Sequence, residues 1–162
     1  MISAGFMNDL IRIVALVCTL AAPSAAAGQT IDVVTADGRT TEVALGTLER
    51  RSVTTEDRGL KTTFDGVHLR DVLSAAGVEF GEALKGRALA QVVIASARDG
   101  YRVAYAIAEL DPAFTERIVL LADRRDGRPL LPDTGPLQIV VVGEKRPARW
   151  IRQLLKLEVK QF

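Results

Sequence analysis

Apolar residues recur at every second position in several short runs of the chain, a period that predicts β-strands. The runs TIDVVT (30–35) and TTEVAL (40–45) flank an Asp-Gly turn, which predicts a hairpin. SVTTED and KTTFD are expected to form two short strands around Arg58-Gly59. Residues 89–106 contain a near-continuous apolar run, then RDG, then an alternating run, and therefore predict a hairpin of buried strands.

Helical spacing replaces this alternation in three segments. In VHLRDVLSAAGV (67–78) the apolar residues fall on roughly one helical face and Gly77 provides a stop, so we expect a helix that covers a sheet. DPAFTER (111–117) predicts a short helix with Asp111 as its N-cap. A third short helix is expected in RPARWIRQLL (146–155), entered at a proline.

The remaining apolar runs are expected to be strands. IVLLA (118–122) and LQIVVVG (137–143) predict core strands separated by a long surface loop. LKLEV predicts a last, half-exposed strand with Leu155, Leu157 and Val159 facing inward. No internal repeat or linker divides these segments into two domains.

The N-terminal segment has the pattern of an export signal. Arg12 precedes the apolar run IVALVCTLAA, and small residues up to Ala27 suit a signal peptidase. We expect residues 1–27 to be a signal peptide, starting at Met1 or Met7, and residues 28–162 to be a single periplasmic or secreted domain. The apolar run is too short to span a bilayer, so no membrane span is expected after its removal.

Composition and charge exclude several classes of function. The 162 residues include 21 Lys and Arg against 20 Asp and Glu, with only 5% aromatic residues, so nucleic acid is not expected as a partner. Loss of Cys18 with the signal would leave no thiolate for metal binding or nucleophilic attack. His68 is the only histidine, and we interpret it as a surface or helix-start residue.

The order and spacing of five segments resemble a known family. They are FDGVHLRDVLSAAGV, ASARDGYRVAYAIAEL, IVLLADRRDGRPL, TGPLQIVVVGE and ARWIRQLLKLEV. Together they resemble the molybdopterin-binding domain of the sulfite oxidase superfamily, in its small exported single-domain form, over residues 31–159. The resemblance implies an α+β fold of mixed β-sheets with short covering helices, which agrees with the periodicity.

The resemblance also implies where a cofactor pocket would lie. In catalytic members a cysteine thiolate binds molybdenum from the strand and loop before the GVxLRDVL helix, whereas SVTTED offers Ser52, Thr54 and Thr55. A protonated hydroxyl is a poor ligand for such a centre, so molybdopterin is possible by resemblance and molybdenum is not expected. The cofactor-binding candidates carried over are Thr54, Asp99, Tyr101, Arg102, Gln138 and Arg149.

Ordinary structural roles compete with three of these assignments. Asp99 lies in an Asp-Gly turn, Tyr101 suits a sheet edge, and Arg149 suits a solvated helix face. Three functions remain open: a binding or sensory module for a small-molecule ligand or an exported protein partner, a molybdopterin-dependent oxidoreductase, and an accessory subunit of a periplasmic redox or sensory system.

The export prediction can be checked by mass spectrometry of protein recovered from the periplasm. Cleavage after Ala27 gives a chain that begins at Gly28. Full-length protein retained in the membrane would contradict the signal-peptide interpretation.

Overall fold

A computed structural model describes residues 29–162 of the chain, so the predicted signal peptide and Cys18 lie outside the described residues. The strands are β1 (Thr30–Val34), β2 (Thr40–Ala44), β3 (Arg51–Asp57), β4 (Leu60–His68), β5 (Gln91–Ala97), β6 (Arg102–Ala106), β7 (Val119–Arg125), β8 (Arg128–Pro129), β9 (Gln138–Val141) and β10 (Leu154–Gln161). The helical segments are α1 (Leu69–Ala75) and the short 3₁₀ turns η1 (Leu45–Thr47), η2 (Gly81–Ala83), η3 (Gly86–Ala90), η4 (Ile107–Leu110) and η5 (Pro147–Arg149).

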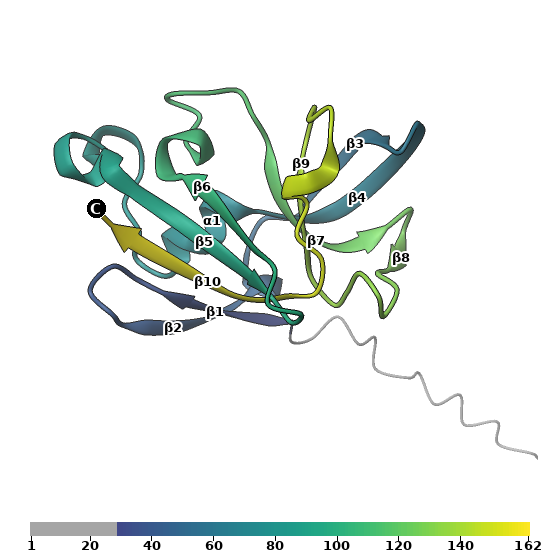
Figure 1. Cartoon of the computed structure of the whole chain (residues 1–162), viewed down its shortest axis with the longest axis horizontal. Coiled ribbons are helices and arrows are strands. Elements are labelled where there is room, and N and C mark those ends of the chain that lie inside the picture. The colour runs from purple at the N-terminus through teal and green to yellow at the C-terminus, as the bar shows by residue number, and fades with distance from the viewer. Residues whose placement is uncertain (1–28) are drawn as a thin grey trace, which may run out of the picture.

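The strands form two sheets that lie side by side in Figure 1. The first sheet has the order β2-β1-β10-β5-β6, in which β1 and β10 are parallel and the other pairs antiparallel. The second sheet has the order β3-β4-β7-β8, and β9 also pairs with β7. The α+β class with mixed sheets is therefore confirmed.

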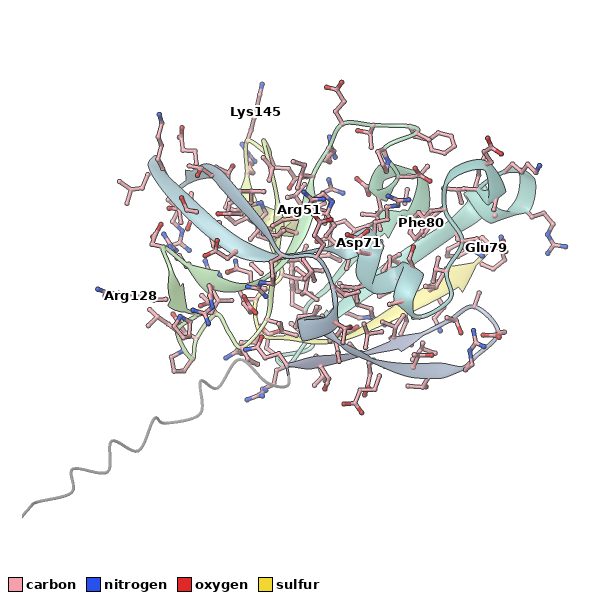
Figure 2. All side chains as sticks on the ribbon, turned by 180° about the vertical axis from the view of Figure 1, so that it is seen from behind. Arg51, Asp71, Glu79, Phe80, Arg128 and Lys145 are labelled. Atoms are coloured by element: carbon pink, nitrogen blue, oxygen red, sulfur yellow. The ribbon has the colours of Figure 1, made fainter. Side chains whose placement is uncertain are left out.

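One cluster of buried apolar side chains joins both sheets to α1. Helix α1 lies behind β5 and β6 in Figure 1 and in front of the first sheet in Figure 2. Its buried residues are Leu69, Val72 and Leu73. These follow the spacing expected from the sequence, so the prediction of a covering helix is confirmed.

The three predicted strand pairs are confirmed, with a register set by their turns. In the first hairpin Val34 pairs with Thr40 and Thr30 with Ala44, across a turn that contains Gly38 at φ +84°. A positive φ is a conformation that glycine adopts without a steric penalty. Strands β3 and β4, and strands β5 and β6, pair in the same antiparallel way.

The predicted start of α1 was wrong by two residues. Val67 and His68 belong to the end of β4, where they pair with Leu121 and Leu120 of β7. Pairing with a neighbouring strand satisfies backbone groups that the first turn of a helix would leave without partners. The helix therefore begins at Leu69 and not at the first apolar residue of the predicted face.

The helix predicted for residues 111–117 is absent from the described structure, and turns replace it. Asp111 is buried, and its carboxylate accepts hydrogen bonds from the backbone N–H groups of Ala113 (2.9 Å) and Gly81 (2.5 Å). Burial alone would raise the pKa of the Asp111 carboxyl, but these two hydrogen bonds bring that pKa below its ordinary value. Asp111 thus ties two loops together instead of capping a helix.

Three further predictions in the C-terminal half need correction. Only η5 of the helix expected at residues 146–155 forms, because β10 begins at Leu154. A register shift between Leu154 and Lys156 buries Leu154 and leaves Leu155 exposed, contrary to the predicted alternation. Part of the expected surface loop, including Arg128, pairs with the end of β7 as β8.

The close approach of β4 to β7 depends on Gly66. A Cβ atom at this position would lie 2.0 Å from the backbone oxygen of Leu121. We expect Gly66→Ala to lower the free energy of unfolding by more than about 3 kcal/mol, because the two strands would have to separate. Gly59→Ala, at φ +82° in open space, is the matched control and should cost about 1 kcal/mol in thermal or chemical denaturation. Equal losses for the two variants would contradict this account.

Candidate functional site

A groove with a volume of about 360 Å³ lies where three separate segments meet. The segments are the turn between β3 and β4, the turn between β5 and β6, and residues 147–152. The residues that line it are Arg58, Ala97, Asp99, Tyr101, Pro147, Ala148, Trp150 and Arg152. Its volume is in the range of small-molecule pockets, and its lining combines charged, aromatic and small residues.

Trp150 holds residues 147–152, which form one wall of the groove, against strands β4 and β9. Its indole is 6% exposed and donates a hydrogen bond to the backbone oxygen of Val141 (3.0 Å). The ring meets Phe64 of β4 edge to face, with centroids 5.5 Å apart and planes at 89°. Because Trp150 is held on two sides, residues 147–152 have a fixed position against β4 and β9.

Asp99 and Tyr101 form the opposite wall, so the structure brings two of the predicted site residues together. The Asp99 carboxylate accepts a hydrogen bond from the Tyr101 backbone N–H (2.9 Å). The Tyr101 hydroxyl donates to the backbone oxygen of Ala148 (2.7 Å), and its ring is 49% exposed. The hydroxyl is thus used to hold the turn against residues 147–152, whereas the ring remains accessible.

Arg149 is next to Trp150 in sequence, but carboxylates surround its side chain. Its Nε and Nη2 donate to Glu144, and its Nη1 donates to both oxygens of Glu109 at 3.1 Å. Burial would lower the pKa of the guanidinium, but the hydrogen bonds with Glu144 and Glu109 raise it. Arg149 therefore stays charged and already has two carboxylate partners.

Tyr105 lies beneath this ion cluster. The Arg149 guanidinium carbon is 5.4 Å from the centroid of the Tyr105 ring, and the Tyr105 hydroxyl donates to the backbone oxygen of Arg149. Burial raises the pKa of Tyr105 well above its ordinary value, so the phenol remains a hydrogen-bond donor. The cluster anchors the segment before Trp150 to the first sheet.

Like Arg149, the three other predicted site residues lie outside the groove lining. The Thr54 hydroxyl is 2.9 Å from the Thr63 hydroxyl, on the face of the β3–β4 hairpin opposite to Phe64. Arg102 pairs with Glu158 of β10 at 3.5 Å. Gln138 is buried in β9, opposite Ala122 of β7.

Two arginines of the groove were not among the sequence-based candidates. Arg58 stands at φ +53° in a turn that the sequence marked only as a Gly-containing connection. Arg152 lies in residues 146–155, which the spacing predicted to be a helix. Their shared location depends on the packing of β4 against Trp150, which no local pattern encodes.

The α+β fold is consistent with that of molybdopterin-binding oxidoreductase domains. The family model for the oxidoreductase molybdopterin binding domain matches residues 28–162, and the chain belongs to that family. A comparison with curated proteins finds none that matches this chain.

The residues present do not fit the family's molybdenum centre. Cys18 is the only cysteine in the sequence, so residues 29–162 contain no thiolate. Strand β3, where the resemblance places the thiolate, provides hydroxyls instead, and the Thr54 hydroxyl is 2.9 Å from that of Thr63 in β4. A hydroxyl keeps its proton at neutral pH and donates little charge to a metal, so this donor set is unsuited to the role of a thiolate.

We expect the Arg149 cluster to stabilise the fold. Arg149→Met would leave Glu144 and Glu109 half-buried without their shared cation and should lower the free energy of unfolding by about 2 kcal/mol. Adding Glu144→Gln should recover part of this loss, which a double-mutant cycle by chemical denaturation would measure.

Arg117→Met is the matched control for this cycle. Arg117 is more exposed and pairs with the same Glu109 at 3.2 Å, so its loss should cost less than about 1 kcal/mol. If Arg149→Met had no more effect than Arg117→Met, the anchoring role would be wrong.

Proposed function

We propose that the chain is an exported, non-catalytic member of the molybdopterin-binding family that uses its groove to bind a small-molecule ligand or an exported protein partner. The observation that carries the proposal is Thr54 of β3, whose hydroxyl is paired with that of Thr63 of β4, in the segment where the resemblance places the thiolate of catalytic relatives. Redox catalysis in this family depends on that metal ligand, so a chain without it retains the scaffold and not the reaction centre.

The arginine of the predicted cofactor pocket supports the same proposal. Arg149 would have to leave both Glu144 and Glu109 before it could bind a phosphate group. Each charge-assisted hydrogen bond contributes roughly 1.5 to 3 kcal/mol, so this exchange is unfavourable. Arg149 thus contributes to the fold more than to cofactor binding.

Binding capacity resides in other residues of the groove. Arg58 and Arg152 line it and take part in no ion pair among residues 29–162, while the exposed ring of Tyr101 provides an apolar surface. Accessible donors beside an apolar surface are the ordinary composition of a recognition site.

The proposed location rests on the N-terminal pattern of the sequence. A basic residue, a short apolar run and small residues before Gly28 are typical of a cleaved signal. Among the described residues, no helix has the length and apolar composition needed to cross a bilayer.

Molybdenum and pterin analysis of the chain, produced in a host that makes the cofactor, tests the proposal. We expect molybdenum far below stoichiometric amounts and no turnover of sulfite or sulfoxides, because a threonine hydroxyl replaces the thiolate. Thr54→Cys, which places a thiol on one face of β3, should raise the molybdenum content. Thr55→Cys places the thiol on the other face and is the matched control, with no such increase expected. Stoichiometric molybdenum with turnover in the unmodified protein would overturn the proposal and favour a molybdopterin-dependent oxidoreductase.

A further inference from the structure

Five exposed basic residues gather on and beside the groove. Two of them line it, and the other three are within two residues of a lining residue in sequence: Arg58, Arg152, Arg98, Lys145 and Arg146. None of the five takes part in an ion pair among residues 29–162. Figure 2 shows Lys145 projecting from the edge of the molecule. We call these five residues the basic rim.

The carboxylates at the groove do not neutralise the positive charge of the basic rim. Asp99 is the only acidic residue that lines the groove, and its carboxylate accepts the Tyr101 N–H. Glu144, the acidic neighbour of Lys145, is held by Arg149. Since the whole chain has a net charge of only +1, the basic rim is a local feature and not a reflection of overall composition.

Exposed apolar side chains accompany the charges. The Tyr101 ring is 49% exposed inside the groove, and Leu60, two residues after Arg58 at the turn between β3 and β4, is 66% exposed. Apolar side chains exposed next to unpaired cations are characteristic of surfaces that bind another polypeptide.

We propose that the groove and its basic rim bind an extended acidic segment of a partner protein, with one apolar side chain of that segment placed against Tyr101. This inference rests on the proposed function and specifies the partner. The cations come from three chain segments, so a segment with several carboxylates engages more of them than a single small anion does. Of the two aromatic residues that line the groove, Trp150 is 6% exposed and only Tyr101 is accessible, so the groove lacks the series of stacking rings on which single-stranded nucleic acid binds.

Fluorescence anisotropy with a labelled, Trp-free peptide, in which one Phe is flanked on both sides by Asp and Glu, tests this inference. We expect saturable binding that weakens as salt is raised from low to physiological concentration. Trp150 is the only tryptophan in the chain and lines the groove, so its fluorescence should change over the same titration.

Charge reversal locates the binding surface. We expect Arg152→Glu and Arg58→Glu each to weaken binding by at least about tenfold, because each replaces a local attraction with a repulsion. Arg128→Glu is the matched control, since it changes net charge equally at an exposed residue of β8, on a different edge of the molecule from Lys145 (Figure 2). This control should retain most of the affinity. Circular dichroism melts verify that the variants are folded, and the Gln substitution at the same position replaces any Glu variant that is not.

Three results would overturn the inference. They are no saturable binding of the peptide, an equal loss for Arg128→Glu, and equally tight binding of a single-stranded oligonucleotide of the same charge. Failure here would leave the metal analysis of the proposed function unaffected. Stoichiometric molybdenum together with peptide binding would instead overturn the non-catalytic role while retaining the docking surface.

Discussion

The parallel pairing of β1 with β10 is the constraint on which the rest of the structure depends. Asp32 pairs with Lys156 and Val34 with Glu158, so the first and last strands lie side by side. Strand β10 also pairs with β5 from Gln161 to Leu154, so within the described sheet it is the strand that joins the β1–β2 and β5–β6 hairpins. Without β10 the first sheet would divide into two hairpins, and isolated hairpins are marginally stable in water.

This constraint also creates the groove. Because β10 lies beside β5, the residues that precede it meet the β5–β6 turn, where the Arg98 N–H donates to the backbone oxygen of Gln153 (3.0 Å). Just upstream, Ile151 accepts a hydrogen bond from Ile139 of β9 (2.9 Å), and Trp150 packs against Phe64 of β4. The segment that enters β10 is thus shared by both sheets, and a pocket at their junction follows from the topology.

The sequence predicted those parts of the fold that short-range chemistry determines. The hairpin around Gly38 and the covering face of α1 depend on residues a few positions apart, and both are confirmed. Asp111 and Leu155 were misassigned because their surroundings come from elsewhere: a loop at Gly81 for the former and a register shift against β5 for the latter. Tertiary pairing outweighs local preference at such positions.

In the candidate site, too, some residues are positioned by their neighbours in the sequence and others by residues far along the chain. Asp99 and Tyr101 meet in the groove because a single turn carries both. The role of Arg149 depends on Glu109, forty residues away in sequence, and on Glu144. Two carboxylates around one guanidinium convert a residue expected to bind a ligand into an anchor of the groove wall. Among residues 29–162, Arg58 and Arg152 line the groove without an ion-pair partner, so the exposed cations of the groove are not the one that the resemblance indicated.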